Sequence, residues 1–159
     1  MSADSQILIL CVGNILLLDE GFGPRVAEQL LANHSFPPQV NILDRGVMGM
    51  AIIADLRGVT DVLVIDALDN TGEAPGTIMS YTPADLDDHH IWQSAHDTRL
   101  VDVINAASLL GINPRFSCLG VQVQNISPPD FQIGLSPAVE AAIDPMIELI
   151  LAWVSATLA

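Results

Sequence analysis

The amino-acid sequence predicts an α/β protein, a three-layer sandwich in which helices cover both faces of a twisted, mostly parallel sheet of about five strands. Short, continuous apolar runs recur along the chain and stop at glycine or acidic residues, as in strands that are buried on both faces. Between these runs lie segments whose apolar residues recur at helical spacing. Strands that alternate with helices across short links indicate parallel pairing. A length of 159 residues without repeats or linkers favours one domain, residues 1–159.

Five apolar runs predict the strands of this sheet. They lie at residues 7–12, 40–43, 61–66, 77–81 and 115–123. The first and third are apolar at almost every position, which is typical of strands buried on both faces. The fourth is reached from the third without an intervening helix, so an antiparallel direction is open to it.

Three helices are predicted between the strands. The first opens at residues 21–24, where a proline suits the first helical turn, and the second is a short helix over residues 48–56. A polar loop at residues 83–95 leads into the third helix, which Gly111 closes.

A fourth helix is expected near the end of the sequence. It starts at Ser136 and carries an apolar face as far as Val154. Pro145 interrupts the pattern, because proline lacks the amide hydrogen that an inner helical turn needs. Asp144 is placed to cap a second helical segment at that point.

The composition excludes several classes of protein. Apolar residues make up 50% of the chain and charged residues 15%, and the mean hydropathy is +0.46, which excludes a disordered chain. Nineteen acidic residues face five basic ones, all arginine, for a net charge of −14. This charge argues against nucleic acid or an anionic membrane as a partner, and it favours a metal ion, a cationic surface or a neutral substrate.

The sequence also predicts a cytoplasmic protein. Cys11 and Cys118 lie inside apolar runs, as buried thiols do, and two cysteines do not make a disulfide framework. No basic residue precedes the first apolar run, so we expect no secretory signal. No apolar run reaches about 18 residues, so we expect no membrane-spanning segment.

Polar residues at the predicted carboxyl edge of the sheet suggest a site, because ligands of such sheets bind there. Glu20 lies between the first strand and the first helix, in a loop flanked by Gly13 and Gly23. Phosphate binding does not fit this loop, since it has four large apolar residues in a row and then two carboxylates. Glu20 is therefore either a ligand or a carboxylate that interacts favourably with the helix dipole.

Two further residues fall at the same edge. Asp66 closes the apolar run at residues 61–66, where a buried carboxylate is costly unless it is paired or binds a metal; it could equally cap the following turn. His96 precedes the third helix, whose N-terminus keeps an imidazole neutral and able to bind metal, and capping or surface roles are also open to it. Together with Glu20 they make a mixed oxygen and nitrogen set that suits Zn, Ni, Mn or Fe(II) and leaves positions for water or substrate.

A second cluster of potential ligands competes with this set. Residues 87–90 have the sequence Asp-Asp-His-His and lie in the predicted polar loop. Four consecutive polar residues are also typical of a solvated loop, so the sequence leaves both interpretations open.

Several segments together resemble a known family. Residues 9–16 (ILCVGNIL), followed by residues 19–23 (DEGFG), resemble the opening motif of the nickel–iron hydrogenase maturation endopeptidases. The similarity continues along nearly the whole chain, at residues 42–46, 49–50, 64–67, 75–77, 94–96 and 134–140. Enzymes of that family remove a C-terminal extension from the hydrogenase large-subunit precursor after nickel insertion.

The resemblance implies a site and a substrate. The metal-binding acids of the family fall on Glu20 and Asp66, and its histidine falls on His96. The resemblance also implies that nickel already seated in the precursor takes part in recognition, although other divalent metals suit the same ligands. Residues 44–47 are DRGV where the family commonly has DGGT or DCGT, so the sequence leaves open which hydrogenase is served.

The expected activity is that of a metal-dependent endopeptidase, monomeric when free. A metal would polarise the scissile carbonyl or lower the pKa of bound water, and Asp19 or Asp44 would take the proton. The sequence has no evident Ser-His-Asp, Cys-His or His-Glu-x-x-His arrangement, so neither covalent catalysis nor a zinc-peptidase helix is expected. The same ligands would also serve a non-catalytic, nickel-sensing assembly chaperone of the large subunit. A nucleotide-binding domain is disfavoured by the acidic, apolar first loop.

Overall fold

The computed structural model describes residues 5–46, 49–88, 92–93, 99–125 and 130–159 of the chain. Its strands are β1 (Ile7–Cys11), β2 (Val40–Asp44), β3 (Asp61–Asp69), β4 (Ile78–Tyr81), β5 (Trp92–Gln93) and β6 (Arg115–Gln122). Its helices are the 3-10 helix η1 (Leu18–Gly21), α1 (Phe22–Asn33), α2 (Ile52–Asp55), α3 (Pro83–Asp88), α4 (Leu100–Leu109), α5 (Pro137–Glu140) and α6 (Ile143–Leu158).

The strands form one sheet in the order β2-β1-β3-β6-β4. β1 pairs in parallel with both β2 and β3, and β3 pairs in parallel with β6. β4 runs antiparallel to β6, the direction that the missing helix between β3 and β4 left open. The two-residue β5 pairs antiparallel with the last residues of β3, beside this path. The prediction of an α/β fold with a mostly parallel sheet of about five strands is confirmed.

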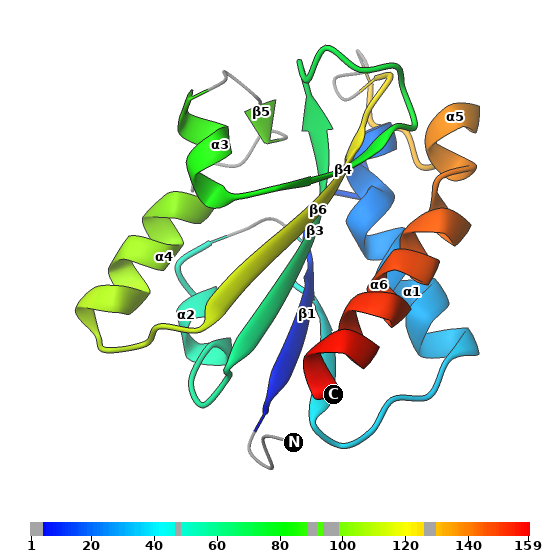
Figure 1. Cartoon of the computed structure of the whole chain (residues 1–159). Helices are drawn as coiled ribbons and strands as arrows, with labels where there is room; N and C mark the ends of the chain where they lie inside the picture. Colours follow the sequence, from blue (N-terminus) through cyan, green and yellow to red (C-terminus); the bar gives the residue numbers. More distant parts are fainter. Residues whose placement is uncertain (1–4, 47–48, 89–91, 94–98, 126–129) are drawn as a thin grey trace.

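Helices cover both faces of the sheet, and the sheet divides the core into two parts (Figure 1). Side chains at alternate positions of a strand point to opposite faces. Ile7 and Ile9 of β1 therefore pack with α1, α5 and α6, whereas Leu8 and Leu10 pack with α2 and α4. β1 is buried at every position, which explains its unbroken apolar sequence.

The predicted polar loop at residues 83–95 contains α3 and β5, so this part of the prediction is wrong. α3 begins after a reciprocal cap, in which the Thr82 N–H donates to Asp85 Oδ2 over 2.7 Å and the Asp85 N–H donates to Thr82 Oγ1 over 3.4 Å. This capping box is visible in the sequence as Thr-Pro-Ala-Asp, with proline at the first helical position. The predicted second helix is also shorter than expected, since α2 has four residues and residues 47–48 lie outside the described part of the chain.

The last predicted helix is divided, as its proline predicted, but the break falls earlier, at residues 141–142. Pro145 is the third residue of α6, where an amide hydrogen has no helical partner to lose. Asp144 does not cap α6, because the N-cap is Ala142 and no side chain hydrogen-bonds there. The expectation of a break is confirmed, and the expectation of an aspartate cap is wrong.

Residues 137–158 form a 22-residue helical stretch that is long and apolar enough to cross a membrane. No such segment was expected from the sequence, because no apolar run reaches about 18 residues. Five residues of α6 are buried in the core with the sheet and α1, namely Ile143, Met146, Ile147, Ile150 and Val154. Packing explains the apolar residues on this buried face.

A salt bridge at the amino edge of the sheet joins β3 to β6. Arg115 donates from Nε to Asp61 Oδ1 over 2.7 Å and from Nη2 to Asp61 Oδ2 over 2.9 Å. These hydrogen bonds lower the pKa of the Asp61 carboxyl, against the opposing effect of burial. The stabilisation from the pair is therefore present above the unfolded-state pKa of about 4 and is lost as the pH falls through the lower folded-state pKa.

We expect the Arg115→Ala variant to show a shallower loss of stability than the wild type between about pH 6 and about pH 2. Because the Arg115 side chain is 78% exposed, the difference should stay below about 1 kcal/mol. Urea unfolding at a series of pH values measures it. Parallel pH profiles for the two proteins would show that the pair does not stabilise the fold.

Candidate functional site

The sheet edge at the carboxyl ends of β1 and β3 is the place where this fold is expected to hold a ligand. β2 lies on one side of β1 in the sheet and β3 on the other. The chain therefore turns to one side after β1 and to the other side after β2, which makes the edge between β1 and β3 a topological switch point. Parallel sheets bind ligands at such switch points. The η1 turn in the loop after β1 packs against β3. The site is therefore built from this loop and the last residues of β3.

Gly13 lets the loop after β1 fold back on itself. Its φ is 150°, and a Cβ atom at this position would lie 1.9 Å from the backbone oxygen of Glu20. The Asn14 N–H donates to that same oxygen over 3.0 Å, and the Gly13 N–H donates to the Gly46 oxygen over 2.8 Å. The end of β1 thus holds together the backbone of Glu20 and the chain that leaves β2.

Glu20 and Asp66 lie on elements that contact each other, and both are buried. Glu20 in η1 is 1% exposed and Asp66 in β3 is 0% exposed. β3 continues to Asp69, so Asp66 lies inside the strand, and the prediction that Asp66 ends the strand is wrong. On the neighbouring strand, Cys11 at the end of β1 pairs with Ile65. Asp66 is thus the first residue of β3 beyond the end of β1, at the switch point of the sheet.

The Asp66 side chain lies on the face of the sheet that α4 covers. Val64 and Leu68 belong to the core on that face, and strand alternation places Asp66 between them. Its Oδ1 accepts a hydrogen bond from the Ala67 N–H over 2.8 Å. β5 pairs with β3 at Leu68 and Asp69, so the backbone of β5 lies beside β3 two residues beyond Asp66.

His96, the third predicted ligand, lies outside the described residues, as do residues 89–90 of the competing cluster. Its described neighbours in the chain are Gln93, which pairs with Leu68 of β3, and Arg99, the N-cap of α4. Within the part of the chain that the structure describes, no three His, Cys, Asp or Glu side chains gather as a metal site. The three-residue ligand set stays a prediction, with two of its members placed on contacting elements.

Asp19 is a buried structural anchor. Its Oδ2 accepts hydrogen bonds from the N–H groups of Gln124 over 2.9 Å and Asn125 over 3.0 Å, and its Oδ1 accepts one from the Ser136 N–H over 2.7 Å. The Ser136 hydroxyl lies 2.7 Å from Oδ2 and 2.9 Å from Oδ1. Both oxygens of this carboxylate are engaged by donors of the chain, so Asp19 is unsuited to act on the attacking water. Its partners lie more than 100 residues further along the chain, so sequence reasoning missed this function.

Asp44, the other predicted proton acceptor, is exposed at the end of β2. Its Oδ1 accepts a hydrogen bond from the Gly46 N–H over 2.9 Å. It lines a groove of about 300 Å³ at the carboxyl ends of β1 and β2, together with Gly13, Asn14, Ile15, Pro24 and Gly46. A peptide in this groove would contact both Asp44 and the loop that carries Glu20.

The two cysteines are poor nucleophiles. Burial, and next the charge of Asp44, raise the pKa of the Cys11 thiol. Burial, and next the charge of Asp66, raise the pKa of the Cys118 thiol to about 12. Both are buried free thiols, as predicted, and both stay protonated near neutral pH. Neither of them supports covalent catalysis.

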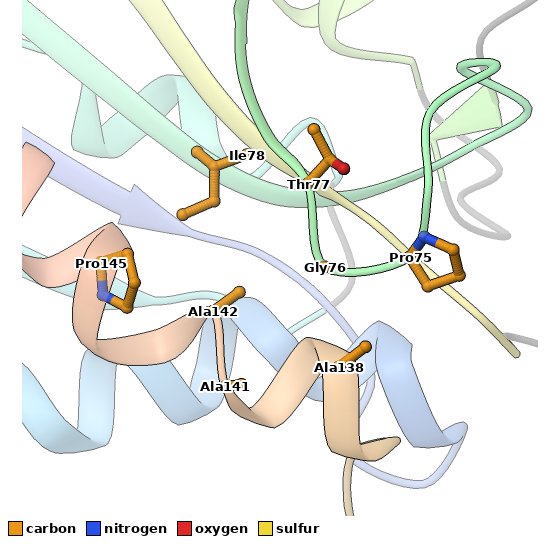
Figure 2. Close-up of a pocket in the computed structure, with 8 residues that line it drawn as sticks. All are labelled: Pro75, Gly76, Thr77, Ile78, Ala138, Ala141, Ala142 and Pro145. Carbon is orange, nitrogen blue, oxygen red and sulfur yellow. The ribbon is translucent and has the colours of Figure 1, made fainter.

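A second groove, of about 370 Å³, lies between the segment that leads into β4 and the helices α5 and α6 (Figure 2). Its lining consists of Pro75, Gly76, Thr77, Ile78, Ala138, Ala141, Ala142 and Pro145. Gly76 has a φ of 86°, and a Cβ atom there would lie 2.5 Å from the backbone oxygen of Ala138, so the close approach in Figure 2 requires glycine. The described lining residues include no ionisable side chain, so this groove offers no acid–base chemistry.

The chain that carries Glu20 and Asp66 at this switch point is similar to known proteins over nearly its whole length. A family model described as hydrogenase maturation protease matches residues 24–153. The hydrogenase 2 maturation protease of Escherichia coli is 38% identical over 152 residues, which cover 92% of this chain and 89% of that protein. The hydrogenase expression/formation protein HupD of Bradyrhizobium diazoefficiens is 35% identical over 156 residues, covering 93% of this chain and 77% of that protein.

Solved structures show the same fold. The hydrogenase maturating endopeptidase HybD from Escherichia coli has a TM-score of 0.85 at 36% identity, over 96% of this chain and 93% of that chain. A [NiFe] hydrogenase maturation protease from Thermococcus kodakarensis, at 22% identity, shares the fold with a TM-score of 0.77, over 93% of this chain and 98% of that chain. From the matched model and the relatives above 30% identity, the chain belongs to the hydrogenase maturation protease family.

Proposed function

We propose that this protein is an endopeptidase that removes the C-terminal extension of a nickel–iron hydrogenase large-subunit precursor after nickel insertion. The observation that carries the proposal is the burial of two carboxylates, Glu20 and Asp66, on contacting elements at the switch point of the sheet. Buried ionisable groups at the ligand-binding edge of a parallel sheet are typical of functional sites. Membership of the maturation protease family supports the same activity.

Nickel enters this proposal as part of the substrate. Two carboxylates and an imidazole suit nickel as well as zinc and other divalent metals, so the chemistry of Glu20, Asp66 and His96 fits the role. His96 follows Gln93 by three positions, a reach of about 10 Å, and Gln93 pairs with β3 two residues beyond Asp66. A precursor without nickel would lack the group that these side chains recognise, so processing would wait for nickel insertion.

Hydrolysis needs a group that takes a proton from the attacking water. Asp44 fits this role, because it is exposed at the groove beside the loop of Glu20, whereas the oxygens of Asp19 already accept hydrogen bonds. The proton would go to a carboxylate oxygen of Asp44, while the Gly46 N–H holds that side chain in place. A metal bound between substrate and enzyme would polarise the scissile carbonyl and lower the pKa of the water.

We also propose that the protein acts in the cytoplasm and as a monomer. A cytoplasmic enzyme fits two free, buried thiols, and a monomer leaves the groove with Asp44 open to a large protein substrate. A net charge of −14 makes nucleic acid and anionic membranes poor partners. The partner that fits the family of this chain is the large-subunit precursor itself.

The intact mass of the precursor tests the proposal. A nickel-loaded large-subunit precursor from the same organism is incubated with this protein, beside a nickel-free sample of the same precursor. We expect loss of one C-terminal peptide from the loaded sample alone. A stable complex that never loses mass would contradict the proposal and favour a nickel-sensing assembly chaperone. Cleavage of both samples would keep the peptidase and remove the requirement for nickel.

A further inference from the structure

We propose that an exposed apolar platform beside the site docks an apolar segment of the precursor that is flanked by cationic side chains. The platform is formed by Ile15, Leu16, Phe131 and Ile133. This inference rests on the proposed function, because the precursor is the occupant. The platform would add a binding surface beside the carboxylates and the groove of the site.

The exposure of the platform is high for residues of this type. Phe131 is 77% exposed and Ile133 73%, while Ile15 is 48% and Leu16 41% exposed. Single exposed apolar residues are ordinary, but a group of large ones marks an interaction surface. Four such side chains on two neighbouring segments make a group.

Backbone hydrogen bonds hold the two segments of the platform together. The Leu18 N–H donates to the Gln132 oxygen over 2.9 Å, and the Gln132 N–H donates to the Leu16 oxygen over 2.8 Å. Phe131 and Ile133 flank Gln132 and, two residues apart, share one side of their segment. The bonds of Asp19 to residues 124–125 and to Ser136 fasten both ends of the same stretch. The exposure of the four side chains is therefore imposed by the fold.

The platform is continuous with the candidate site. Ile15 also lines the groove that contains Asp44. Leu16 and Glu20 belong to one short loop, whose backbone is closed by the bond from Asn14 to Glu20. A segment lying on the platform would thus lead directly into the groove, as a substrate chain must.

The charges around the platform indicate which charges the bound segment of the precursor should carry. Both platform segments come from stretches without a cationic residue, residues 1–24 and residues 116–159. Asp130 is exposed next to Phe131 in the chain. Four of the five arginines form salt bridges with carboxylates of this chain, namely Arg25, Arg45, Arg99 and Arg115. Cationic residues beside an apolar segment would therefore gain affinity, and acidic ones would lose it.

Charge also argues against a second copy of this chain as the occupant. Each copy would bring a net charge of −14 to the contact, and like charges at an interface oppose association. The precursor, which has to reach the groove in any case, is the occupant that fits the position of the platform.

Binding of the precursor to surface variants tests the inference. Phe131→Ser and Ile133→Ser remove platform side chains that are mostly exposed, so the fold should be unaffected. The matched controls are Leu109→Ser, 90% exposed at the end of α4, and Leu31→Ser, 63% exposed near the end of α1. The carboxyl-terminal ends of α1 and α4, which carry these two residues, lie toward the amino edge of the sheet (Figure 1). Phe131→Lys adds a cation to the platform and tests the charge of the segment.

We expect each platform serine variant to bind the nickel-loaded precursor about tenfold more weakly by calorimetry. The KM for processing should rise with little change in kcat, since docking does not touch the reacting bond. The control variants should stay within about twofold of the wild type. Phe131→Lys should bind more weakly than Phe131→Ser at low salt, and the difference should shrink as salt is added.

The outcomes separate this inference from the proposed function. Platform variants that bind like the controls, with the wild type still cleaving, would overturn the docking site alone. Weakened binding by the platform variants without any cleavage by the wild type would support docking and overturn the peptidase. Tighter binding by Phe131→Lys than by Phe131→Ser would overturn the cationic segment. A wild-type dimer in sedimentation that Phe131→Ser dissociates would overturn the precursor as occupant in favour of a second copy.

Discussion

Processing of the precursor is expected to fall at least about a thousandfold in the Asp66→Asn and Glu20→Gln variants, with the fold retained. Each amide keeps the shape of the acid it replaces, and the oxygen of an asparagine at position 66 can still accept the hydrogen bond from the Ala67 N–H. What each variant loses is the negative charge that would meet the metal of the substrate. Single-turnover assays with the nickel-loaded precursor measure the loss.

Stability should move in the opposite direction from activity. Burial of a carboxylate costs more free energy than burial of a neutral amide of the same shape. Glu20 and Asp66 are both almost completely buried, so the Tm of each variant should equal or exceed that of the wild type. Thermal unfolding followed by circular dichroism measures this.

Asp61→Asn is the matched control for both variants. Asp61 is a buried acid on the same strand as Asp66, but it lies at the other end of that strand and pairs with Arg115. Its amide variant should lose stability and keep its rate of processing. Turnover at the wild-type rate in Asp66→Asn or Glu20→Gln would remove that residue from the site.

The Gly13→Ala variant is expected to lose about 3 kcal/mol or more of its free energy of unfolding. A Cβ atom at this position would overlap the backbone oxygen of Glu20 at 1.9 Å, and the φ of 150° is unfavourable for alanine. The conflict is with backbone atoms, so a side-chain rotation cannot relieve it. Urea unfolding measures the free energy, and the rate of processing should fall with it because Glu20 would be displaced.

Gly49→Ala provides the control for this substitution. No atom lies within 4 Å of a Cβ built on Gly49, and its φ lies outside the left-handed region. The free energy of unfolding should change by less than about 1 kcal/mol. Equal stability of Gly13→Ala and Gly49→Ala would contradict the tight closure of the loop after β1.

The strands were predictable from the sequence because their burial is a local pattern. Residues 7–11 have an apolar side chain at every position, since both faces of β1 are covered. The end of β3 was not predictable in the same way, because residues 67–69 are strand only through their pairing with β6 and β5. The cap of α3 at Thr82 and Asp85 is a different case, since the signal was present in the sequence and was missed.

The candidate site was only partly predictable. Glu20 and Asp66 were found from the sequence because each follows or ends an apolar run, and such positions meet at one edge of a parallel sheet. The distinction between Asp19 and Glu20 could not be made from sequence, because it depends on Ser136 and other donors that reach Asp19 through the fold. His96 lies outside the described residues, so its part in the site is still a prediction.

The anchoring of Asp19 has a consequence for how such a protein can diverge. One carboxylate fastens both ends of the stretch between Asn125 and Ser136, while most of its own charge is satisfied by backbone N–H groups that any sequence supplies. The residues between these ends can therefore be exchanged during evolution without disturbing the frame that holds Glu20. With the proposed function and docking surface, recognition by this stretch and chemistry at Glu20 are separable, so a new client protein can be acquired by changing the stretch alone.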